Sequence, residues 1–122
     1  MFTKDLSAHL TVTALVQPGN KTTTQTSAAL DIIDYEGDLL VLQSVGTLTA
    51  GTCAGTIEDS ADGATGWAAV SGATFAAVAA NQLQELKLDK RSCKRYVRYV
   101  GTLAGGPDMN MAVIIAGQLK RQ

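Results

Sequence analysis

The sequence of 122 residues is poor in the side chains from which most catalytic and metal sites are built. It contains one histidine, His9, two cysteines, two phenylalanines, three tyrosines and one tryptophan. A single imidazole excludes a His–His metal pair, and Cys53 and Cys93 do not have metal-ligand spacing. The serines near Asp62 come without a recognisable base or oxyanion hole. We therefore expect no enzymatic activity, no cofactor and no metal site.

Charge and hydropathy exclude further classes of protein. A net charge of −1 gives no attraction of the whole molecule to nucleic acid or to anionic membranes. No apolar run approaches the roughly 20 residues that a membrane span needs. The first 16 residues lack the continuous apolar stretch of a secretory signal, so we expect free thiols in a reducing cytosol. A disulfide between facing strands is the alternative for Cys53 and Cys93.

Short apolar segments separated by turns are the most regular feature of the chain, and they predict an all-β, antiparallel β-sandwich in one domain. Strands are expected at residues 28–35, 39–45, 53–60, 67–71, 83–89, 95–102 and 109–119. The run L-L-V-L is apolar on both faces, which indicates a central strand covered on both sides. Loops are expected at 47–52 and 103–108. For residues 73–80, a loop or short strand is favoured over an Ala-rich helix.

The stretch from Ile57 to Val70 has the features of a β-hairpin. Gly63 can adopt the positive φ of the turn, and Asp62 suits the neighbouring position. Trp67 falls on the return strand, where its ring is expected to cover one end of the core. The three acids of the E-D-S-A-D-G run lack the ligand ladder of a calcium loop, so they are interpreted as solvated turn residues.

The N-terminal segment, residues 1–16, is predicted to be an arm or a first strand, and residues 17–122 form the sandwich. The sequence Q-P-G-N at 17–20 predicts a turn between the two. Phe2, Leu6 and Leu10 are apolar residues of this segment that can become ordered against a neighbouring protein. A frayed terminus or an ordinary first strand is the alternative.

Residues 87–100 hold six of the ten basic residues, interleaved with Tyr96 and Tyr99. On a strand the two rings point to opposite faces and cannot form one stacking platform, so direct nucleic-acid binding is not expected. Residues 1–62 hold eight of the eleven acids. Acidic and basic strands therefore pair within one chain, or an acidic edge meets the basic edge of another copy. The basic candidates for an interface are Arg91, Lys94, Arg95 and Arg98.

Three segments carry a resemblance to a known family: A-L-D-I-I-D-Y-E-G at 29–37, I-E-D-S-A-D-G at 57–63 and K-R-Y-V-R-Y-V-G-T at 94–102. In order and spacing the chain resembles the capsid decoration, or cement, proteins of tailed bacteriophages. The resemblance implies a jelly-roll-like sandwich without catalytic residues. It implies a virion protein made in the bacterial cytoplasm, which binds major capsid subunits on the outer capsid surface and associates with its own copies as a dimer or trimer. A neck or tail component, and more remotely a carbohydrate-binding sandwich, are the alternatives.

Overall fold

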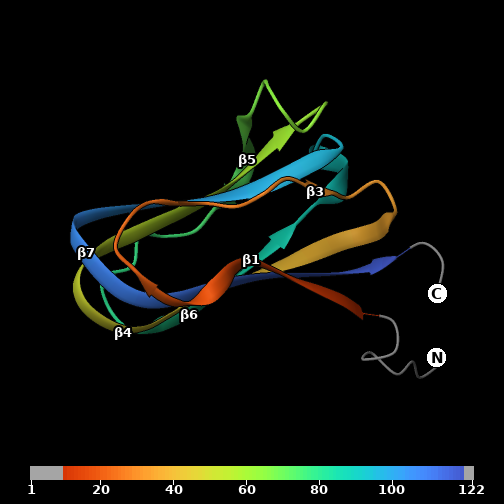
Figure 1. Cartoon of the computed structure of the whole chain (residues 1–122). Coiled ribbons are helices and arrows are strands. Elements are labelled where there is room, and N and C mark those ends of the chain that lie inside the picture. The colour runs from red at the N-terminus through yellow and green to blue at the C-terminus, as the bar shows by residue number, and fades with distance from the viewer. Residues whose placement is uncertain (1–9, 120–122) are drawn as a thin grey trace.

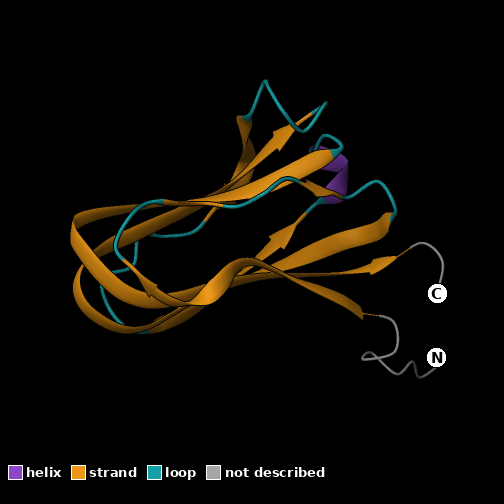
Figure 2. Ribbon diagram, in the orientation of Figure 1, coloured by secondary structure: helices purple, strands orange, loops and turns teal. Residues whose placement is uncertain are grey.

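The computed structural model describes residues 10–119, and nearly all of them lie in strands or tight connections (Figures 1 and 2). The strands are β1 (Leu10–Lys21), β2 (Gln25–Thr26), β3 (Leu30–Asp31), β4 (Tyr35–Ser60), β5 (Ala68–Thr74), β6 (Gln82–Leu88) and β7 (Tyr96–Leu119). A 3-10 turn, η1 (Lys90–Ser92), joins β6 to β7. No helix in the described part is long and apolar enough to cross a membrane.

The predicted antiparallel sandwich is confirmed, and its strand order is that of a jelly roll. β4 and β7 are so long that each contributes to both layers, and all their pairings are antiparallel. One layer has the order β1, the end of β7, the start of β4, and β6. The other has the order β2 and β3, the start of β7, the end of β4, and β5. These are two four-membered layers with Greek-key connections, and Figure 1 shows them one above the other.

The loops predicted at residues 47–52 and 103–108 are wrong, because β4 and β7 pass through both segments as paired, bent strands. Gly51 has φ +94°, and a Cβ there would lie 2.6 Å from the Cα of Pro107. Opposite it, Ala50 pairs with Asp108 and Thr52 with Ala104, so β7 carries a bulge of extra residues. Gly105 and Gly106 also have positive φ. The glycines therefore mark where two neighbouring strands turn together from one layer into the other.

The core lies between the layers and is formed by alternate residues of the long strands. In β4, Leu39, Val41 and Val45 are almost fully buried, and the alternate residues of β7, Met109, Met111, Val113 and Ile115, are buried as well. Val97 and Tyr99 point inward between more exposed neighbours. The period-2 alternation expected of strands is thus confirmed on both central strands.

Several local predictions can be compared with the described chain. The hairpin between β4 and β5 is confirmed by the pairs Glu58–Ala69 and Asp59–Ala68. Residues 73–80 contain no helix: the first two end β5, and Val78 forms an isolated bridge to Cys53, so the predicted loop or short strand is correct. The turn predicted at 17–20 is wrong. β1 continues to Lys21 through register shifts, because a bulge accommodates the Pro-Gly pair without ending the ladder.

Candidate interaction surface

The predicted interface residues fall into three groups in the structure. Phe2 and Leu6 lie outside the described residues, as does His9. Leu10 is the first residue of β1 and is 37% exposed at the edge of its layer. The basic candidates are on or next to the η1 end of the sandwich, where β6 returns to β7. Residues 10–16 belong to β1, and the rest of the predicted N-terminal segment lies outside the described residues.

The η1 turn positions the exposed basic residues Arg91 and Lys94. Asp89 follows the last residue of β6. Its carboxylate accepts a hydrogen bond from the Arg91 backbone N–H at 3.0 Å, and this bond caps the turn. Downstream, the buried Asp59 carboxylate accepts from the Lys94 backbone N–H at 3.0 Å. Both Arg91 and Lys94 are exposed. The backbone is therefore fixed by hydrogen bonds while the two cationic side chains remain available to a partner.

Arg95 is bound within the chain by a fork of hydrogen bonds to Asp31 in β3. Its Nη2 lies 2.9 Å from Asp31 Oδ2, and its Nε lies 3.2 Å from both carboxylate oxygens. The hydrogen bond from Arg95, aided by one from the Ile33 backbone, lowers the pKa of Asp31 below its ordinary value. The guanidinium also lies 5.2 Å from the centre of the Tyr96 ring. The pair is largely exposed, so it orders the strand ends more than it stabilises the fold.

Arg98 is more deeply committed to contacts inside the chain. It forms a 2.7 Å ion pair with Glu58 on the neighbouring strand, and its guanidinium lies 4.4 Å from the centre of the Trp67 ring. Trp67 is therefore half-buried beneath Arg98 on an outer face, instead of covering the core as predicted. The two cross-strand ion pairs show that acidic and basic strands of the two halves pair within one chain.

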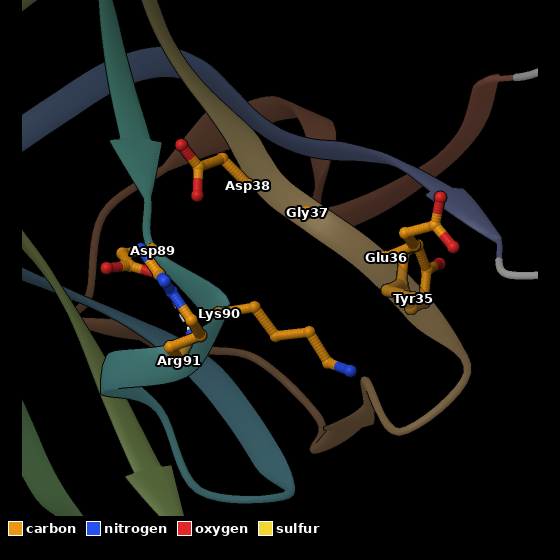
Figure 3. Close-up of a pocket in the computed structure, with 7 residues that line it drawn as sticks. All are labelled: Tyr35, Glu36, Gly37, Asp38, Asp89, Lys90 and Arg91. Atoms are coloured by element: carbon orange, nitrogen blue, oxygen red, sulfur yellow. Dashed lines mark hydrogen bonds and ion pairs between the residues drawn. The ribbon is translucent and has the colours of Figure 1, made fainter.

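Two hollows flank η1 and share Lys90 and Arg91. The larger, of about 540 Å³, is lined by Tyr35, Glu36, Gly37, Asp38, Asp89, Lys90 and Arg91. The smaller, of about 260 Å³, is lined by Ile32, Ile33, Lys90, Arg91, Cys93, Lys94 and Arg95. Figure 3 shows the Lys90 side chain extending from η1 toward Tyr35 and Glu36. With Ile33 44% exposed, this end combines charges of both signs with an apolar contact, as protein-binding surfaces do.

The acids of the hairpin are used by the chain itself. Asp62 Oδ1 accepts from the Ala64 and Thr65 backbone N–H groups at 2.9 Å each, and these bonds, Thr65 first, lower the pKa of Asp62 far below its ordinary value. Glu58 is paired with Arg98. Among the described residues no group of three potential ligands could hold a metal ion. The interpretation as solvated turn residues agrees with the contacts of Asp62, but it is wrong for Glu58 and Asp59, which lie in β4, where Asp59 is buried and Glu58 is partly buried.

Free cysteines and a buried polar chain complete the inventory of reactive groups. Cys53 and Cys93 are both free, as expected. Cys53 Sγ lies 3.6 Å from the buried Tyr99 hydroxyl, which donates a hydrogen bond to Gln43 Oε1 in the opposite layer. Gln43 then donates to Gln84 at 2.7 Å. This row of buried hydrogen bonds was not predicted from the sequence, although a Gln at an inward position of L-L-V-L-Q-S-V was a usable signal.

The fold is similar to two solved structures. The PBSX exported protein XepA has a TM-score of 0.68 and 16% identity, covering 98% of this chain and 40% of XepA. The SPBc2 prophage-derived protein YomS has a TM-score of 0.55 and 15% identity, covering 88% of this chain and 92% of YomS. The chain thus spans well under half the length of XepA and matches YomS over most of its length. No protein-family model matches the sequence, and no curated protein matches it. The likeness establishes a shared fold.

Proposed function

We propose that the protein is a bacteriophage virion structural protein that decorates the capsid and stabilises it by binding across neighbouring major capsid subunits. The observation that carries this proposal is the fold likeness over nearly the whole chain to YomS, a prophage-derived protein. The motifs that resemble phage decoration proteins point the same way. The jelly-roll architecture, with its free strand edges and ordered turns, suits a protein whose task is to be bound on several sides.

Stabilisation of the capsid follows from linkage. A protein that binds only where two capsid subunits meet lowers the free energy of the assembled shell relative to free subunits, by an amount that grows with occupancy. The contact must therefore come from surfaces that the monomer leaves free. At the η1 end, Arg91 and Lys94 are both exposed. The ion pair of Arg91 with Asp89 is long, at 3.5 Å, and leaves the Arg91 side chain 91% exposed, whereas Arg95 and Arg98 form closer ion pairs within the chain.

A binding experiment with empty capsids of the phage that encodes the protein tests the proposal. The protein should co-sediment with the capsids, and the Arg91→Glu/Lys94→Glu double variant should bind at least about tenfold more weakly, because two attractive charges become repulsive. The matched control is Lys21→Glu, a reversal at the far end of β1. Full binding by the double variant would remove the η1 end from the contact, and no binding by the wild-type protein would overturn the proposal.

The contribution of the N-terminal segment is tested by removing residues 1–9 and not the whole predicted segment, residues 1–16. Removing residues 1–16 would delete seven residues of β1, from Leu10 to Val16, and with them part of the ladder to β7. Removing only residues 1–9 keeps β1 whole and isolates the contribution of Phe2 and Leu6. We expect weaker capsid binding with unchanged circular dichroism.

Immunogold labelling of virions then locates the protein, and label confined to the neck or tail would favour the alternative site.

A further inference from the structure

The layer formed by β1, β7, β4 and β6 is apolar on its outer face as well as on the side that faces the core. In β4 the inward residues Leu39, Val41 and Val45 are buried, so the alternate residues Leu40 and Leu42 point outward. The register extends this outer face across the layer. The residues on it are Val12 and Ala14 of β1, Ala112, Ile114 and Ala116 of β7, Leu40, Leu42 and Ser44 of β4, and Leu83, Glu85 and Lys87 of β6.

Much of this outer face is accessible to solvent in the single chain, where Leu40, Leu42 and Ile114 are partly exposed and Ala116 is buried. Val12 and Leu83, at its two edges, are 58% and 62% exposed, although both are large apolar residues. An antiparallel layer with water on one side normally alternates apolar and polar residues. Here the central strands present Leu40, Leu42 and Ile114 instead, which agrees with a strand covered on both sides. The face is therefore expected to be covered in the functional protein.

We propose that a second copy of this chain covers the face. The two copies are related by a two-fold axis that lies between the two faces and runs perpendicular to the strands. The register makes the face complementary to itself about such an axis at the level of Val41 and Ile115. The axis brings Leu40 over Leu42 of the other copy. It also brings the small Ala116 over Ile114, and Ala14 over Val12, so that large side chains meet small ones.

The charges on this face support a second copy over another partner. Lys87 and Glu85 are exposed, lie two residues apart on β6 and are paired with Leu40 and Leu42. The same axis places Lys87 of each copy near Glu85 of the other, on either side of the axis along the β6 edge of the contact. A face that carries one cation and one anion in these positions attracts its own copy without any net charge on either partner.

The size of the face sets the expected strength. Four strands about 4.8 Å apart, with about five residues each at about 3.3 Å, give a flat area of roughly 300 Å² per copy. This is comparable to the largest apolar patch of an ordinary monomer, about 300–600 Å². It is small for a permanent interface, so we expect a reversible dimer with a dissociation constant of about micromolar order.

Sedimentation velocity on the whole chain, from about 1 to 200 µM, tests this arrangement without any capsid, so its outcome is independent of the decoration proposal. The wild-type protein should shift from monomer to dimer over this range, and Leu42→Lys should weaken the dimer at least tenfold. Val100→Lys is the matched control, because Val100 is partly exposed on the outer face of the other layer. Circular dichroism and the melting temperature confirm that each variant is folded.

Charge exchange on β6 tests the two-fold register itself. Glu85→Lys and Lys87→Glu should each weaken the dimer, since each places like charges together, and the double variant should restore it. A protein that stays monomeric throughout the range would overturn the proposal. An assembly that Leu42→Lys does not weaken would also overturn it. So would an assembly larger than a dimer that either single change weakens and the double exchange does not restore.

Discussion

The buried hydroxyl of Tyr99 offers the sharpest test of how the two layers are held in register. Tyr99 comes from β7 in one layer and donates a hydrogen bond to Gln43 Oε1, which comes from β4 in the other. Both side chains are fully buried. Gly55 and Gly101 leave the space that the ring occupies, since a Cβ at either would lie 2.7 Å from a ring carbon. The Tyr99→Phe substitution removes the hydroxyl and keeps the packing of the ring.

The expected loss can be worked out from these contacts. After Tyr99→Phe the Gln43 carbonyl oxygen remains buried, and within the described chain its remaining donor is the Cys53 thiol at 3.8 Å, which is a weak one. A buried acceptor that loses its partner costs about 1–3 kcal/mol. For a domain of this size 1 kcal/mol corresponds to about 4 °C in melting temperature. We therefore expect the melting temperature to fall by about 4–12 °C.

Calorimetry or circular dichroism melts of four variants, Tyr99→Phe, Tyr96→Phe, Gln43→Leu and the Tyr99→Phe/Gln43→Leu double variant, separate this mechanism from a loss of packing. Tyr96→Phe is the matched control, because Tyr96 is partly exposed on the outer face, and it should change stability by less than about 0.5 kcal/mol. Combining Tyr99→Phe with Gln43→Leu removes both partners. The double variant should then be less destabilised than the sum of the single ones, with a coupling of about 1 kcal/mol or more. A Tyr99→Phe protein as stable as the wild type would refute the reasoning.

Three further predictions concern the turn, the thiols and alkaline pH. Gly63→Ala should destabilise the protein more than Gly66→Ala. Both glycines have positive φ, but of the two only Gly63 would bring a Cβ against the Tyr96 ring, at 3.0 Å. Equal melting temperatures of the two variants would argue against this contact. Burial first, and then the charges of Asp59 and Asp89, raise the pKa of the Cys93 thiol from 9.0 to about 11. Its reaction with a thiol reagent should therefore be slow at pH 9 and should accelerate toward pH 11. A fast reaction at pH 8 would contradict this. Burial also raises the pKa of Tyr99 above its ordinary value, so the folded state keeps a proton that the unfolded state loses. This contribution to stability is complete below about pH 10 and is lost as the pH rises further, and the unfolding free energy of Tyr99→Phe should depend less on pH there, as denaturant melts from pH 8 to 11 would show.

The alternation of side chains was sufficient to predict the fold class and much of the core. The alternating rows of β6 and β7 could be identified from a period of two, because each strand has one face toward the other layer, whereas L-L-V-L in β4 is apolar on both faces and did not show which face is inward. The turn at Gly63 could be predicted for a local reason as well, since a positive φ is a property of the residue itself. The apolar character of Leu40 and Leu42 predicted a strand covered on both sides, but in the single chain only the inner face of β4 is covered.

Local sequence could not distinguish a loop from a strand that bends. Gly51 and the Gly105–Gly106 pair have the composition of a turn, yet β4 and β7 stay paired through them because each supports the bend of the other. The fate of the basic residues was also undetermined. Arg95 and Arg98 find Asp31 and Glu58 only because β7 lies between β3 and β4.

The sequence by itself determined which residues share one face of a strand, since side-chain direction along a strand alternates whatever the neighbouring strands are. Only the tertiary structure decided which strands lie side by side. That choice sets the jelly-roll order, leaves Arg91 and Lys94 exposed at one end, and joins the outward residues of four strands into one apolar face. The physical reason is that the ladders of β7 with β1 and β4 connect residues from 36 positions apart (Ser60 and Tyr96) to 108 positions apart (Leu10 and Gln118), and no local pattern contains that information.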